Sequence, residues 1–197
     1  MRVLKKILLF ALCTGFVAAS AHADPRADLQ QSFEQVLAAG GFRGYAQGRV
    51  FGPELPALAG DVEVVFPDRI HASTESMEFI AIGERAWLSA AGLWTTVDRS
   101  LVPVSAFDMR GVRQAIATIR DARIEGTAKT SQCAAHVYAF RASGHLPGAA
   151  ANGDLRAWRC DDTGHLARIE ATDARTHERM IFDFDWSRRV RVQAPAD

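Results

Sequence analysis

The chain has 197 residues, and its 23 lysines and arginines are balanced by 23 aspartates and glutamates. A neutral chain without a basic excess argues against a nucleic-acid partner. The length is that of one domain with a sizeable core, and the sequence shows no internal repeat or domain boundary.

Residues 1–23 have the pattern of a secretory signal. A basic start is followed by an apolar run over residues 7–19 and by small residues up to Ala23. We therefore expect cleavage after Ala23 and a single periplasmic domain over residues 24–197. A membrane anchor is the alternative, but the apolar run is shorter than the roughly 20 residues of a spanning helix. Cys13 follows a leucine rather than a small residue, so we do not expect a lipid-modified cysteine.

An amphipathic helix is predicted directly after this segment. Asp24 and Pro25 suit the N-cap and the first helical position, and Gly40 with Gly41 ends the run. We expect a helix over Pro25–Ala39. Its apolar stripe consists of Leu29, Phe33, Val36 and Leu37.

The hydrophobic period then changes to two. Phe42–Phe51 predicts a strand with glycines on one face, where a helix or a ligand can approach closely. Gly60–Asp98 predicts a run of short antiparallel strands separated by turns. Within it, Glu78–Ile82 is apolar on both faces, which indicates cover on both sides. We expect the predicted helices to act as lids over this stretch.

A second helix is predicted over Ala106–Arg120, and strands resume after it. Residues 142–154 are rich in glycine, alanine and proline and are expected to form a mobile loop. The later predicted strands are 122–128, 133–141, 155–161, 166–172 and 179–186. The whole pattern predicts an α+β domain dominated by an antiparallel sheet.

Two cysteines, Cys133 and Cys160, remain after the signal segment. An even pair in a secreted domain favours a disulfide, which for a loop of this size is worth about 3 to 4 kcal/mol. Two buried free thiols are the alternative. If the cysteines face each other in an antiparallel pair, Ala135 lies opposite Trp158.

No catalytic, cofactor or metal-binding motif is found. The sequence lacks a nucleophile elbow, a zinc-protease motif and a phosphate loop, and its histidines are scattered. Asp183 and Asp185 are the best candidates for a small hydrolase, since residues two apart on a strand lie about 6.7 Å apart on one face. They alternate with aromatic residues, so a half-buried strand with a wet outer face is the preferred interpretation.

Aromatic residues gather on the predicted strands. They include Trp87, Trp94, Trp158, Trp186, Phe66, Phe79 and Phe182. An ordinary core explains each residue alone. Together, a curved sheet and two helices make a cup whose mouth is a usual place for an apolar cavity.

The sequence also resembles LolA-type lipoprotein carriers and the related LppX/LprG-like lipid-binding lipoproteins. The matching residues are Gly60-Asp61, Pro67, Gly83-x-x-x-Trp87, FDFDWS at 182–187 and VRVQAP at 190–195. The resemblance implies an incomplete antiparallel β-barrel whose concave face is capped by helices. It also implies carriage of acyl chains between envelope membranes.

One departure from the resemblance concerns the residue before Pro67. LolA carriers have an arginine there, implicated in lipoprotein transfer, whereas this chain has Phe66; the apolar position three residues past the proline is kept as Ile70. We therefore expect a retained hydrophobic site without the transfer residue. The expected ligand-binding residues are Phe66, Ile70, Phe79, Trp87, Trp94, Phe107 and Ile116.

The favoured function is a periplasmic binding or carrier protein for an acyl-chain ligand, with transient membrane or envelope-protein contact. The alternative is a protein-interaction module, such as an envelope-stress sensor on the same fold. A small hydrolase is the third possibility.

Overall fold

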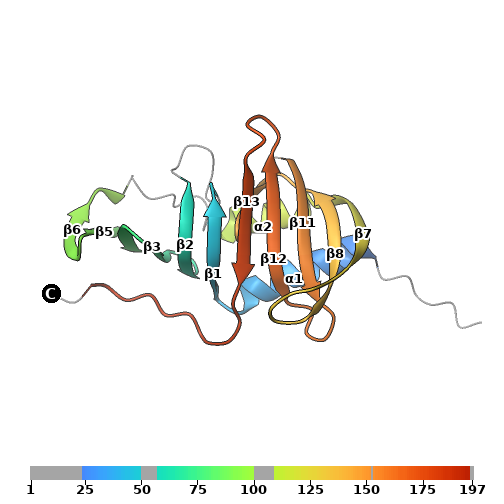
Figure 1. Ribbon diagram of the computed structural model, residues 1–197, viewed down its shortest axis with the longest axis horizontal. Coiled ribbons are helices and arrows are strands. Elements are labelled where there is room, and N and C mark those ends of the chain that lie inside the picture. Colours follow the sequence, from blue (N-terminus) through green and yellow to red (C-terminus); the bar gives the residue numbers. More distant parts are fainter. Residues whose placement is uncertain (1–23, 50–56, 100–108, 152, 196–197) are drawn as a thin grey trace, which may run out of the picture.

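The computed structural model describes residues 24–49, 57–99, 109–151 and 153–195 (Figure 1). The elements in this part of the chain are α1 (Pro25–Ala38), β1 (Gly41–Gly48), β2 (Leu58–Val65), β3 (Arg69–Thr74), β4 (Met77–Ile82), β5 (Arg85–Ala90), β6 (Leu93–Val97), α2 (Met109–Ala117), β7 (Arg120–Lys129), β8 (Ala134–Arg141), β9 (Gly144–Leu146), β10 (Ala149–Ala151), β11 (Gly153–Cys160), β12 (Leu166–Asp173) and β13 (Arg179–Phe184).

A single sheet of 11 strands dominates the fold. Its strand order is β6-β5-β4-β3-β2-β1-β13-β12-β11-β8-β7, and its neighbouring strands are antiparallel. The sheet ends at β6 and β7 without closing. This confirms the predicted α+β fold with an incomplete antiparallel barrel.

We call the sheet face on which α1 packs the inner face. The ring of Phe33 in α1 meets Phe140 in β8 edge-on at 6.2 Å, and the Tyr138 hydroxyl donates to Asp28 Oδ2 at 3.1 Å. Residues paired across antiparallel strands point to the same side. The pairing register therefore carries the inner face across the sheet as far as Ile70 in β3 and beyond.

Helix α1 begins as the sequence predicts. The side chain of Asp24 accepts a hydrogen bond from the backbone N–H of Arg26 at 3.0 Å, which caps the helix start. Its predicted apolar stripe is buried, together with Ser32, whose hydroxyl donates to the Gly164 carbonyl at 2.7 Å. The stripe therefore fixes the helix on the sheet.

Helix α2 is shorter than the predicted Ala106–Arg120. Both the backbone N–H and the hydroxyl of Thr118 donate to the Ala115 carbonyl, and β7 already begins at Arg120. The predicted residues 106–108, including Phe107, lie outside the described part of the chain.

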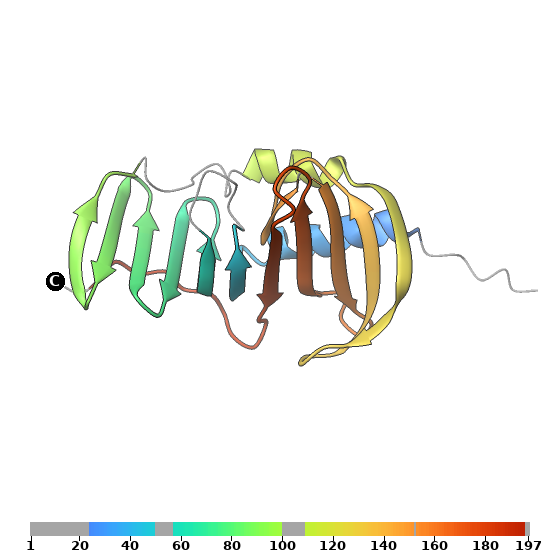
Figure 2. The same ribbon diagram turned by 45° about the horizontal axis from the view of Figure 1, so that its top comes forward.

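The helices pack against only part of the sheet. Helix α1 packs on β1, β7 and β11, and α2 packs on α1 and β9. Figures 1 and 2 show β2 to β6 extending away from both helices, and we call these five strands the wing. The expected helical lid over Gly60–Asp98 is thus not what the described residues form. Only Ala39 and Gly40 separate α1 from β1, so the helix folds back over β1 and the later strands.

The predicted mobile loop over residues 142–154 is wrong. This segment contains the short strands β9 and β10, which form an antiparallel hairpin. Leu146 and the alanines of β10 are 3% exposed or less, and β9 packs on α2. The small residues that suggested a loop instead let the hairpin lie close to the core.

The predicted disulfide between Cys133 and Cys160 is confirmed, with the Cα atoms 5.7 Å apart. The predicted register is wrong, because Cys160 pairs with Ala135 and Trp158 is shifted by two residues from its expected place. Cys133 lies before β8, in a turn where the Thr130 hydroxyl accepts its backbone N–H at 3.0 Å. From this position it reaches Cys160 diagonally.

Candidate ligand-binding site

The inner face of the wing is apolar. Paired residues of β4, β5 and β6 form three rows on this face. The rows are Met77, Ala90 and Leu93; Phe79, Leu88 and Thr95; and Ala81, Ala86 and Val97. Thr95 is the polar exception. We call this set the wing patch.

Exposure decreases steadily across the wing patch. In the outermost row Leu93 is 76% and Met77 50% exposed, whereas Ala81 and Ala86 in the innermost row are fully buried. Phe79 of the middle row is partly buried and packs against the central core. The patch is therefore a continuation of the core into solvent.

Three of the predicted ligand-binding residues share this face. Ile70 is 1% exposed and belongs to the core, while Phe66 and Phe79 are partly buried at its border. The Phe66 ring lies 5.9 Å from Phe42. Phe66 thus adds to the apolar surface. Ile116 is buried in the packed side of α2.

The structure does not bring Trp87 and Trp94 to the wing patch. Trp87 pairs with Ile80 and Trp94 with Ser89, and these pairs lie on the outer face of the sheet. The sequence does contain a signal for this placement, since Trp87 alternates along the strand in phase with the polar Arg85 and Ser89. The prediction grouped the tryptophans by residue type and did not use their positions in this alternation.

The other two tryptophans have structural contacts. Arg168 lies over the Trp158 ring at 5.8 Å. The Trp186 ring stacks on Phe184 at 5.8 Å, and its N–H donates to the Leu166 carbonyl at 2.7 Å. Neither is on the wing.

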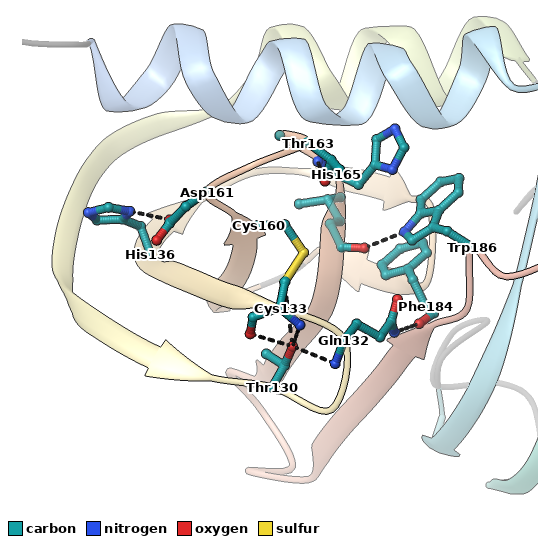
Figure 3. Close-up of a disulfide and its surroundings, with 12 residues drawn as sticks. Thr130, Gln132, Cys133, His136, Cys160, Asp161, Thr163, His165, Phe184 and Trp186 are labelled. Carbon is teal, nitrogen blue, oxygen red and sulfur yellow. Dashed lines mark hydrogen bonds and ion pairs between the residues drawn. A yellow bond between two sulfur atoms is a disulfide. The ribbon is translucent and has the colours of Figure 1, made fainter.

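Figure 3 shows how the disulfide is tied to the end of β13. The side-chain amide of Gln132, beside Cys133, donates to the Phe184 carbonyl. The Trp186 indole in the same view bonds to β12 through its hydrogen bond to Leu166. The disulfide therefore links the turn before β8 to β11, and the hydrogen bond from Gln132 adds the end of β13 to this group.

An open surface pocket of about 650 Å³ lies beside α2. Sequence reasoning did not single out its described lining, although a stripe at helical spacing was the available signal. The lining residues are Met109, Arg110, Arg113, Gln114 and Ala117. None of the predicted ligand-binding residues is among them.

The two candidate catalytic acids are held by arginines. Arg168 donates to Asp183, with its Nη2 2.9 Å from Oδ2. Arg43 Nε lies 3.0 Å from Asp185 Oδ2, but its N–H is not directed at that oxygen, so this contact is an ion pair without a hydrogen bond. Hydrogen bonds from the side chain and backbone of Ser187 lower the pKa of Asp185, which favours its charged form.

The described residues contain no group of three or more histidine, cysteine, aspartate or glutamate side chains placed to hold a metal ion. Within the same ranges, no helix has the length and apolar character needed to cross a membrane.

Comparison with known proteins identifies the fold. No protein-family model and no curated protein sequence matches this chain. The structure of the lipoprotein LppX from Mycobacterium tuberculosis matches with a TM-score of 0.62 and 16% identity, covering 86% of this chain and 98% of that one. LprF from Mycobacterium bovis matches with a TM-score of 0.61 and 13% identity, covering 88% and 97%. A LolA superfamily protein from Nitrosomonas europaea gives a TM-score of 0.32 at 8% identity, covering 83% and 92%. The chain therefore shares the fold of LppX and LprF, as the resemblance implied.

Proposed function

We propose that this protein binds an acyl chain of a lipid or lipoprotein on the wing patch and carries it through the periplasm. The observation that carries this proposal is the exposed apolar end of the patch, with Leu93 76% and Met77 50% exposed. Exposed apolar surface costs about 25 cal/mol per Å² relative to burial, so a continuous patch favours a ligand or partner. The resemblance of the sequence to lipid-binding lipoproteins, together with the fold shared with the lipoprotein LppX, supports the lipid class.

Two further features support a periplasmic location. The Cys133–Cys160 disulfide suits an oxidising environment, and residues 1–23 have the pattern of a signal that is removed. On this proposal residues 24–197 act as one domain. The engagement of Asp183 and Asp185 with arginines fits a binding protein better than a hydrolase.

The proposal is tested with a pair of variants on β6. Leu93→Asp places a carboxylate on the inner face, where it must be desolvated against a bound chain. Thr96→Asp places the same charge at an exposed position of the outer face, because Thr96 pairs with Trp87. We expect Leu93→Asp to weaken binding of a fluorescent palmitoyl probe to delipidated protein by about tenfold or more, a difference of about 1.4 kcal/mol.

Thr96→Asp is the matched control and should keep the wild-type affinity. Equal affinities of wild type and both variants would remove the wing patch as the site. Absence of probe binding to the wild-type protein, together with a lipid-free mass for protein purified from its native envelope, would contradict the carrier function itself.

A protein-interaction module remains the second candidate because of the β6 edge. β6 is an end strand of the sheet, and its sequence LWTTV contains no charged residue or proline. Such an edge can accept an extended segment of a partner by strand addition. Recovery of one stoichiometric periplasmic protein, lost on Thr95→Pro but kept on Thr96→Asp, would favour this candidate.

A further inference from the structure

The β6 edge is open to further pairing. Among the described strands β6 pairs with β5 alone, and its sequence LWTTV carries no charge or proline that would discourage a new neighbour. Both threonines are exposed, and Leu93 is the most exposed large apolar residue of the described chain. Such an edge is a template for one more antiparallel strand.

The turn before β6 determines which backbone groups face this edge. It separates β5 from β6 so that the last residue of β5 lies directly opposite Leu93. A two-residue turn closes on a hydrogen-bonded pair, and hydrogen-bonded pairs then alternate with non-hydrogen-bonded ones. The first, third and fifth residues of β6 therefore direct their backbone N–H and C=O groups to β5. Trp94 and Thr96 direct theirs to the open edge.

The outward backbone groups of β6 are complementary to those of a second β6 strand. When a two-fold axis at Thr95 relates two antiparallel β6 strands, Trp94 lies opposite Thr96 of the second copy. These two residues exchange N–H···O=C hydrogen bonds, and the symmetry repeats the pair on the other side of the axis. This register also pairs all 5 residues of Leu93–Val97. It therefore satisfies the outward groups of the whole strand.

The side chains match in the same register. On the inner face Leu93 lies beside Val97 of the second copy, and the two Thr95 side chains meet at the axis. On the outer face Trp94 lies beside Thr96 of the second copy. Pairs of apolar, aromatic–β-branched and threonine–threonine side chains favour strand pairing, and the strand has no charge to repel its own copy. Since the two-fold axis keeps both inner faces on one side, the two wing patches join into one apolar surface.

We propose that two copies of this protein associate through their β6 edges, in an antiparallel register centred on Thr95, to form a two-fold dimer with one continuous sheet. The self-complementarity of the edge is what identifies the partner as a second copy. Each copy contributes one short strand, which is small beside the standard interface of about 1,600 Å². The association is therefore weak and depends on protein concentration. The proposal concerns assembly and does not depend on acyl-chain binding.

Sedimentation velocity over a range of protein concentrations tests the association. Thr96→Pro removes an N–H that faces the edge and leaves the hydrogen bonds between β5 and β6 intact, a position where an edge strand tolerates proline. Thr96→Val keeps this N–H and the side-chain shape, so it is the matched control. We expect wild type and Thr96→Val to form dimers as the concentration rises, and Thr96→Pro to raise the dimer dissociation constant by at least about tenfold. Circular dichroism confirms that each variant is folded.

Cysteine substitution tests the register independently of proline. In the proposed dimer the two Thr95 residues form a non-hydrogen-bonded pair with Cα atoms about 4.5 Å apart, which suits a disulfide. The two Thr96 residues are offset by two positions along the strands, which places their Cα atoms beyond the roughly 7 Å limit for a bridge. On oxidation with copper phenanthroline, Thr95→Cys should therefore form covalent dimers at least about tenfold faster than Thr96→Cys, as measured on non-reducing gels.

Wild-type protein that stays monomeric up to its solubility limit would overturn the proposal and leave the edge to a segment of another protein. Equal dissociation constants for wild type and a folded Thr96→Pro would place the interface elsewhere and overturn it as well. Cross-linking of Thr96→Cys as fast as Thr95→Cys would overturn the register. Each result is independent of the affinity for the palmitoyl probe, so failure of the dimer and failure of the proposed function are distinguishable.

Discussion

At the residue scale, Tyr138 shows how a polar side chain is accommodated under α1. Its ring is 2% exposed, and its hydroxyl donates to Asp28 Oδ2 at 3.1 Å. Burial, followed by the negative charge of Asp28 and their hydrogen bond, raises the pKa of Tyr138 to about 12. The phenol is therefore held in its neutral form and joins α1 to β8.

The raised pKa of Tyr138 can be measured by titration, because the chain has two tyrosines and removing one leaves a single phenol. In the variant Tyr45→Phe, Tyr138 is the remaining tyrosine, so phenolate absorbance during alkaline titration reports Tyr138 alone. We expect a midpoint near pH 12 in place of the ordinary 10. The further change Asp28→Asn removes the charge that raises the pKa and should lower the midpoint. A midpoint at 10 in Tyr45→Phe would contradict the packing of α1 on β8.

The same shift gives the sign of a stability change. A tyrosine whose pKa is higher in the folded than in the unfolded state stabilises the fold fully below pH 10, and this contribution is lost as the pH rises toward 12. Two pKa units correspond to at most about 3 kcal/mol. The Tyr45→Phe variant should lose free energy of unfolding across this range, and a protein that also carries Tyr138→Phe should lose less.

At the element scale, local chemistry decided which elements the sequence could predict. Strands β5 and β6 lie within the predicted run of short antiparallel strands, because Ala91 and Gly92, with φ of 53° and 78°, form a tight turn between two alternating stretches. The hairpin β9–β10 was missed because its alanines and glycines alternate neither in size nor in polarity. Its burial depends on contacts with α2 and β12, which lie far away in the sequence.

The candidate site was predictable only in part for a related reason. Ile70, Phe66 and Phe79 follow from alternation along their strands, and they do share the inner face. The strand pairing places Trp87 on the outer face instead. The residues that line the pocket beside α2 do recur at helical spacing, but whether such a stripe lines a pocket depends on how the helix packs in the fold.

The β9–β10 hairpin can be tested at Gly148, which lies at its turn with φ of 82°. A Cβ added there would lie 2.9 to 3.1 Å from atoms of Phe182, which is fully buried and cannot move aside. Gly92 has a similar φ of 78° but no atom within 4 Å of an added Cβ. Both alanine variants therefore carry backbone strain, and Gly148→Ala adds overpacking.

We expect Gly148→Ala to lower the free energy of unfolding by about 1 to 3 kcal/mol more than Gly92→Ala does. Chemical denaturation with matched m-values measures the difference. Equal losses in the two variants would show that the hairpin does not pack on Phe182.

At the scale of the whole molecule, one open sheet serves two purposes. Around β8, β11, β12 and β13, the inner face is filled by aromatic and aliphatic side chains under α1, and the disulfide joins the turn before β8 to β11. In the wing the same sheet continues with helices placed elsewhere, and its outer rows are exposed. The part of the sheet that packs under α1 thus supports the wing, whose exposed apolar face a ligand can cover.

This division predicts a gradient of amide hydrogen exchange. Local opening costs least where buried apolar contacts are few, so amides of β5 and β6 should exchange faster than those of β11 and β12 in the ligand-free protein. β6 is also an end strand, so part of its backbone lacks a partner strand. The other end strand, β7, packs on α1 and should exchange more slowly than β6. Comparing the two end strands therefore separates the effect of the helical cover from that of the edge itself.

A palmitoyl probe in saturating amount should slow exchange in β4 to β6, because it buries the wing patch and raises the free energy of local opening there. Exchange in β11 and β12 should change less, since their side chains are already covered. Mass spectrometry of peptic fragments measures both regions in one experiment. Protection confined to β11 and β12 would place the ligand under α1 instead, and uniform protection would indicate global stabilisation without a site on the wing.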